Sequence, residues 1–66
     1  MIRLQIEGMS CGHCVSAVRE ALAEVAGVER VTSVDLETGA ATIEGRAEPR
    51  ALIAAVEEAG YTARAA

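Results

Sequence analysis

The sequence contains no lysine, phenylalanine or tryptophan, and Tyr61 is its only aromatic residue. Ten acidic residues against six scattered arginines give a net charge of −4. A phosphate-binding face needs clustered positive charge, so we do not expect nucleic-acid binding. Without Phe or Trp, the core must be built from Val, Leu, Ile and Ala, and such small side chains favour helices packed closely on a sheet.

Long apolar runs are also lacking. No stretch approaches the ~20 apolar residues that a membrane-spanning helix needs, so we expect no membrane insertion. The first residues alternate apolar and polar side chains and carry charge, unlike a signal peptide. We therefore expect a cytoplasmic protein whose thiols stay reduced. At 66 residues, the chain is expected to form a single domain, residues 1–66, of modest stability.

Hydrophobic periodicity predicts the secondary structure. Residues 2–6 alternate as a half-buried strand does, and helical spacing begins at Cys14. Gly27 suits a left-handed helix stop, and Pro49 suits the first position of a second helix. In chain order, the expected elements are a strand at 2–6, a helix from 14 to 26, a strand at 28–36, a turn at 37–39, a strand at 40–44, a helix from 49 to 59 and a strand at 61–64.

This order, β-α-β-β-α-β, predicts an α+β fold of the ferredoxin-like class. It is a sandwich of one four-stranded antiparallel sheet with two helices on one face. The topology brings the loop after the first strand and the start of the last strand to the same end of the sheet. We therefore expect Cys11, Cys14 and Tyr61 to be neighbours.

The segment Gly8–Cys14, GMSCGHC, holds both cysteines of the chain. Thiolates select soft ions such as Cu(I) and also bind Zn(II) and Hg(II). The helix start should lower the thiol pKa, especially for Cys14. Zn(II) usually takes four ligands, but His13 is the only histidine and there is no third cysteine. The ligand count therefore favours Cu(I) or Hg(II), which accept two thiolates.

A two-thiolate site on a surface loop suits metal delivery better than storage or catalysis. A partner's thiolate can enter, form a three-coordinate intermediate and remove the ion. Catalytic metal sites need firmer ligation and an enclosed substrate position. We therefore expect a protein that is not an enzyme.

GMSCGHC resembles the GMxCxxC motif of the heavy-metal-associated domain family, and in particular its CopZ-like bacterial copper chaperones. The resemblance covers essentially the whole chain. It implies that Cys11 and Cys14 bind Cu(I), that Met9 faces the core without ligating, and that Tyr61 lies beside the metal. Family members that handle Zn(II) often carry an acidic residue just before the first cysteine. Ser10 offers no carboxylate there, which favours Cu(I).

The resemblance also implies partners. These are the N-terminal domain of a heavy-metal-transporting P-type ATPase, to which copper is delivered, and a copper-responsive repressor. One departure from the family is visible. Its second strand follows the pattern GVxxVxVxL, whereas here one extra residue separates Val31 from Val34. This predicts a β-bulge near Thr32 and Ser33.

Several alternatives stay open at this point. His13 is either a third ligand or a solvent-facing residue that tunes the pH response of the site. The protein is either a copper chaperone or a detoxification module for Hg(II), Zn(II) or Cd(II), including a detached domain of a larger transporter or reductase. A thiol–disulfide oxidoreductase is a further alternative. We expect a monomer, with a homodimer bridged by one copper through four cysteines as the other state.

Overall fold

The computed structural model describes all residues, 1–66. Alternation of apolar and polar residues produces strands, and the change to helical spacing after Gly8 and after Pro49 produces the two helices. The elements are β1 (Ile2–Glu7), α1 (Gly12–Ala23), β2 (Val28–Val34), β3 (Ala40–Gly45), α2 (Pro49–Glu58) and β4 (Thr62–Ala65).

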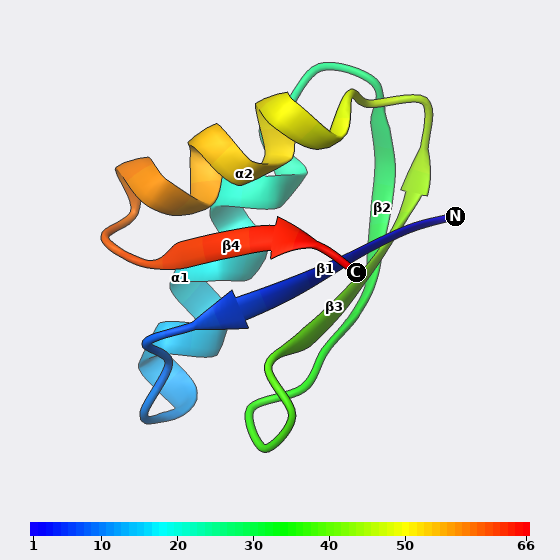
Figure 1. Cartoon of the computed structure of the whole chain (residues 1–66). Helices are drawn as coiled ribbons and strands as arrows, with labels where there is room; N and C mark the ends of the chain where they lie inside the picture. Colours follow the sequence, from blue (N-terminus) through cyan, green and yellow to red (C-terminus); the bar gives the residue numbers. More distant parts are fainter.

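The four strands form one antiparallel sheet in the order β2-β3-β1-β4. Both helices cover the same face of this sheet (Figure 1). The predicted ferredoxin-like α+β sandwich is confirmed. Neither helix has the length and apolar character that crossing a bilayer requires.

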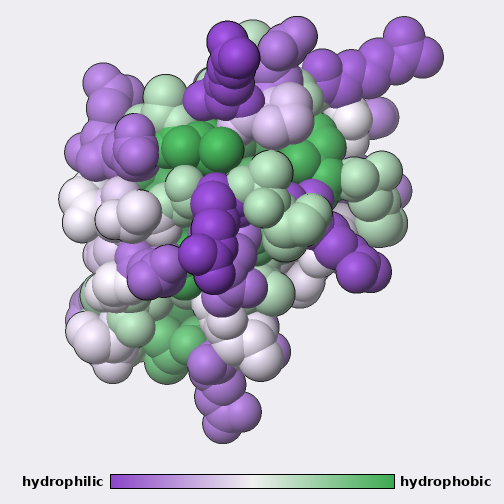
Figure 2. Space-filling model, in the orientation of Figure 1, coloured by the Kyte–Doolittle hydropathy of each residue, from purple (hydrophilic) through white to green (hydrophobic).

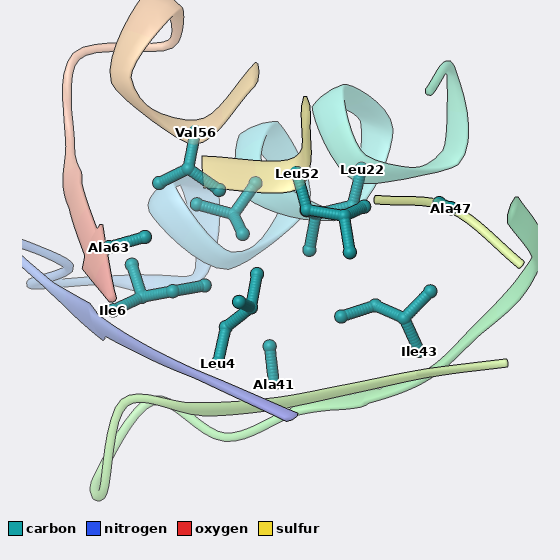
Figure 3. Close-up of a cluster of buried hydrophobic side chains, with 10 residues drawn as sticks. Leu4, Ile6, Leu22, Ala41, Ile43, Ala47, Leu52, Val56 and Ala63 are labelled. Atoms are coloured by element: carbon teal, nitrogen blue, oxygen red, sulfur yellow. The ribbon is translucent and has the colours of Figure 1, made fainter. Parts of the chain in front are cut away.

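The core lies between the helices and the sheet and contains no aromatic side chain. In Figure 3, Leu22, Leu52 and Val56 point from the helices toward Leu4, Ile6 and Ile43 on the strands. No polar or charged residue is buried. On the face drawn in Figure 2, purple hydrophilic side chains separate the green hydrophobic patches. The ten core residues are Leu4, Ile6, Val18, Leu22, Ala41, Ile43, Ala47, Leu52, Val56 and Ala63.

The boundaries of α1 differ from the prediction at both ends. The helix begins at Gly12, earlier than Cys14, because Cys11 takes an extended conformation and serves as the N-cap. It ends at Ala23, with Glu24 as the C-cap, so Gly27 is not its stop. Gly27 lies in the following turn with φ of +91°, where a Cβ would meet the Ala47 backbone at 3.0 Å. Its left-handed conformation therefore serves the close approach of two loops.

The second strand carries the predicted bulge and ends earlier than predicted. Its pairing with β3 shifts register between Val31 and Ser33, which confirms the predicted bulge. It shifts again between Val28 and Arg30, opposite Gly45, where we predicted no irregularity. The strand stops at Val34 because the Asp35 carboxylate accepts the Glu37 backbone N–H at 2.9 Å and starts a turn. Leu36, predicted in the strand, lies in this turn and is 39% exposed.

Candidate metal site

The loop between β1 and α1 packs against apolar groups at its β1 end. Gly8 has φ of +100°, and a Cβ there would lie 3.5 Å from Cδ1 of the Tyr61 ring. Met9 is half-buried and packs against the core. Ser10 and Cys11 follow on the exposed side. The chain therefore passes from Ile6, the last core residue of β1, to the exposed Cys11 within a few residues. Figure 1 shows this loop between β1 and α1.

The start of α1 positions both cysteines. Cys11 is the N-cap, and its carbonyl accepts the N–H groups of Cys14 at 3.0 Å and of Val15 at 3.3 Å. Its side chain makes no capping hydrogen bond, so the thiol remains available. Cys14 stands in the first turn and is half-buried. Both cysteines are free, and their Sγ atoms are 3.7 Å apart. Metal–thiolate bonds of about 2.3 Å allow one ion to contact both sulfurs.

Hydrogen bonds to its sulfur hold the pKa of Cys14 down at about 6. The largest cause is the backbone N–H of Ser10, followed by the Tyr61 hydroxyl, while partial burial opposes them. The Cys11 thiol and backbone lower the pKa further. Hydrogen bonds donated to the sulfur stabilise a thiolate more than a thiol, so Cys14 is largely ionised at neutral pH in the absence of metal.

Tyr61 is the reciprocal partner of this thiolate. Its hydroxyl donates to the Cys14 sulfur, and this hydrogen bond is the main reason that the pKa of Tyr61 is raised. Partial burial and the negative charge of both cysteines add to the effect. Tyr61 directly precedes β4, and β4 pairs with β1, so the sheet brings the tyrosine to the loop. The expected proximity of Cys11, Cys14 and Tyr61 is therefore found.

Other side chains contribute less to the thiol pair. The Ser10 hydroxyl lies 3.9 Å from the Cys14 sulfur. No group of three or more His, Cys, Asp or Glu side chains is arranged to hold a metal ion. His13, an exposed residue of α1, therefore does not gather with the two cysteines. Within this chain, the arrangement offers two thiolates and no third strong ligand.

The main effect on Cys14 comes from a group that sequence reasoning missed. We predicted a lowered pKa from the helix N-terminus, whereas the largest cause is the N–H of Ser10, which precedes the helix. A backbone N–H is present at every residue except proline, so its orientation leaves no trace in the residue type. The one sequence signal near this N–H is Gly8. A glycine readily adopts a positive φ, as Gly8 does here, and so indicates a loop that turns back on itself.

The family model of the heavy-metal-associated domain matches residues 3–62. The chain belongs to the heavy-metal-associated domain family. Among its relatives is a copper chaperone CopZ of Bacillus subtilis, 41% identical over 61 residues, with 88% of this chain and 87% of that protein covered. This heavy-metal-associated domain is also similar to parts of much larger proteins.

Two such larger proteins are a probable copper-transporting ATPase PacS of Synechocystis and a mercuric reductase of Shewanella putrefaciens. They are 42% and 44% identical to this chain and cover 96% and 97% of it. The chain spans only 9% and 12% of their lengths. The solved N-terminal domain of PacS from Synechocystis superposes with a TM-score of 0.91 at 40% identity. That match covers 98% of this chain and 94% of that domain.

Proposed function

We propose that this chain is a metallochaperone that binds one Cu(I) ion through Cys11 and Cys14 and passes it on by ligand exchange. The observation that carries the proposal is a pair of accessible free thiols, 3.7 Å apart, with no third metal-binding side chain beside them. Two thiolates satisfy Cu(I), whereas Zn(II) usually requires four ligands. We take residues 1–66 as one metal-binding domain.

Each neighbour of the thiols has a proposed role. The Ser10 N–H and the Tyr61 hydroxyl keep Cys14 ionised, so the ion need not displace a proton from that sulfur. Tyr61 also shields one side of the ion, and Met9 anchors the loop to the core. His13, which stands apart from the pair, is not a ligand.

We propose that the acceptor is an N-terminal domain of a copper-transporting P-type ATPase. The support is the likeness to the PacS N-terminal domain, which has the same fold. An acceptor thiolate bonds to the ion, which then has three thiolate ligands, and one bond to Cys11 or Cys14 breaks. A second acceptor thiolate then bonds to the ion, and the remaining bond to this chain breaks. Cys11 is the exposed sulfur of the pair, so the acceptor reaches the ion from its side. We place this exchange, and a further exchange with a copper-responsive repressor, in the cytoplasm, where thiols stay reduced.

The first test is an anaerobic titration of the reduced protein with Cu(I) against a strong chromogenic Cu(I) chelator. We expect one tightly bound Cu(I) per chain, and loss of this binding in both Cys11→Ser and Cys14→Ser. His13→Ala is the matched control, because it changes the residue between the cysteines and should leave the affinity within about twofold. Retained binding in either serine variant, or a large loss in His13→Ala, would contradict the proposed ligand set.

Transfer needs a separate measurement. The Cu(I)-loaded protein is mixed with an isolated acceptor domain of the same fold, the two are separated on an anion-exchange column, and the copper in each is measured. We expect copper to distribute between the two proteins within minutes. We expect no transfer when the acceptor cysteines are replaced by serine. Copper transfer no faster than spontaneous dissociation from this chain would contradict the exchange mechanism, but it would not contradict the proposed copper binding. Size analysis with and without Cu(I) decides between monomer and copper-bridged homodimer.

A second candidate is Hg(II) binding, which the similarity to a mercuric reductase favours. Two thiolates also satisfy Hg(II), so affinity alone does not separate the two functions. Deletion of the gene in the source cell separates them. We expect greater sensitivity to copper salts with unchanged sensitivity to mercury salts. The opposite pattern would assign the chain to mercury handling.

A further inference from the structure

The two helices enclose a groove that takes no part in the thiol site. It has a volume of about 510 Å³, and six of its eight lining residues are hydrophobic. Alanines form most of it, among them Ala21 of α1 and Ala51, Ala54 and Ala55 of α2. We call it the helix groove. Small side chains on both helices leave room for a third element to approach their backbones closely.

Carboxylates stand where the helix groove meets each helix end. Glu24 is the C-cap of α1, Glu58 is the last residue of α2, and both line the groove. The two helices run in roughly opposite directions, so these ends lie toward opposite ends of the groove (Figure 1). Neither helix has a basic residue in its last turn, and Arg50 does not line the groove. The negative helix ends therefore add to the carboxylate charges.

We propose that the helix groove is a docking site for a basic amphipathic helix of a partner protein. Its apolar residues pack on the alanine floor, and a Lys or Arg near each end pairs with Glu24 or Glu58. Residues 51 to 58 of α2 rise about 10 Å, so the occupant contributes about two helical turns. Its pattern is apolar residues at i, i+3 or i+4, and i+7, flanked by cations.

Charge complementarity selects this occupant over a second copy of the chain. Each copy carries a net charge of −4, and two grooves facing each other would bring Glu24 and Glu58 against further carboxylates. Like charges at an interface are repulsive, so self-association through this face is disfavoured. The same argument excludes acidic helices and anionic membrane surfaces.

The test uses the reduced, metal-free protein, so its outcome does not depend on copper binding. The probe is a capped synthetic helical peptide with an Ala/Leu stripe and two arginines at each end. The control peptide replaces the arginines with glutamate. Binding is followed by amide chemical shifts of the isotope-labelled protein. We expect shifts concentrated at residues 21–25, at the end of α1, and at residues 51–59, along α2 and its C-cap. We also expect several-fold weaker binding when salt rises to about 0.5 M.

Two pairs of variants test the mode of binding. The double variant Glu24→Gln with Glu58→Gln should lower the affinity for the peptide roughly tenfold. The control double variant Glu29→Gln with Glu37→Gln removes the same charge elsewhere and should change that affinity less than about twofold. Ala54→Phe fills the helix groove and should abolish binding, whereas Ala23→Phe, exposed outside the groove, should not. Equal losses in both glutamine pairs, or shifts spread over the whole surface, would overturn the proposal. Concentration-dependent shifts without peptide would assign the groove to a second copy.

Discussion

Cys11 and Cys14 are the same residue type three positions apart, yet they occupy different chemical environments. Cys14 receives hydrogen bonds from the Ser10 N–H and the Tyr61 hydroxyl, which lower its pKa to about 6. Cys11 is the more exposed of the two and caps the helix with its backbone alone. The pair thus combines one preformed thiolate, ready for a metal ion, with one accessible sulfur, open to an acceptor. This difference can be measured by chemical modification.

We predict that iodoacetamide modifies Cys14 of the metal-free protein with a midpoint near pH 6. The reagent reacts with the thiolate, so the rate follows the ionised fraction. In Tyr61→Phe the hydroxyl donor is lost, and the midpoint should move up toward the ordinary cysteine value of about 8.5. The measurement is pulsed alkylation with mass-spectrometric mapping of each cysteine. Thr62→Ala, a neighbouring exposed residue, serves as control, and an equal shift in that variant would contradict the role of Tyr61.

The same hydrogen bonds make the stability of the metal-free protein depend on pH. The folded pKa of Cys14 lies below the unfolded value of about 8.5, so the unfolded chain binds more protons between these values. The contribution is therefore complete above about pH 8.5 and is lost as the pH falls through about 6. Urea unfolding of the reduced protein across this range should show the free energy of unfolding rising with pH. In Cys14→Ser the slope should fall, and an unchanged slope would rule the hydrogen bonds out as its cause.

At the scale of elements, the turn between β2 and β3 is tied to the strand that leads into the thiol loop. The carbonyl of Gly39 accepts the Ile6 N–H at 2.7 Å, and the Gln5 side-chain amide donates to the Thr38 carbonyl. Gly39 has φ of +75°, and a Cβ there would collide with the Ile6 carbonyl. The hairpin turn therefore supports the end of β1 directly before Gly8.

Two glycine substitutions test this contact. Gly39→Ala should destabilise the protein by about 1–3 kcal/mol, because the left-handed conformation and the collision both oppose a methyl group. Gly12→Ala is the matched control. Gly12 lies in the first turn of α1, and a Cβ added there would meet nothing within 4 Å, so no loss is expected. Thermal unfolding of both variants decides the point, and equal melting temperatures would show that the turn tolerates the side chain.

Strands and helices were predictable from the sequence where the pattern of side chains determines them. They were less predictable where backbone conformation and hydrogen bonds determine where an element ends. The alternation of Ile2, Leu4 and Ile6 specified β1, and Pro49 marked the first residue of α2. Leu36 was misplaced because an apolar side chain usually continues a strand, whereas the Asp35 carboxylate had already started a turn. The second register shift, near Val28, lies opposite Gly45, whose φ of +138° and close approach to the Gly27 carbonyl mark the irregularity. A glycine inside a strand often signals a bulge, but we did not predict one there. At the site, the cysteines and Tyr61 were recognisable from the sequence, but the direction of the Ser10 N–H was not.

For the whole molecule, the absence of aromatic side chains from the buried core makes a few aliphatic residues essential. Ten buried residues form the core, and three of them are alanines. A domain of 66 residues has a free energy of unfolding of only about 3–10 kcal/mol. Leu22 is fully buried between the helices and the sheet (Figure 3). Leu22→Ala should cost about 2–5 kcal/mol, which is a large part of the total stability.

This variant also tests whether metal binding is coupled to the fold. If Cu(I) binds only the folded thiol pair, excess Cu(I) raises the free energy of unfolding by RT ln(1 + [L]/Kd), about 4 kcal/mol at a thousandfold excess over Kd. Far-ultraviolet circular dichroism of Leu22→Ala should then show less structure than the native chain without metal and recovery with Cu(I). Leu36→Ala, the same change at a residue 39% exposed, should alter neither state. Copper binding without recovery of structure would mean that the unfolded thiols bind copper as well as the folded pair does, and that the loop geometry contributes little to affinity.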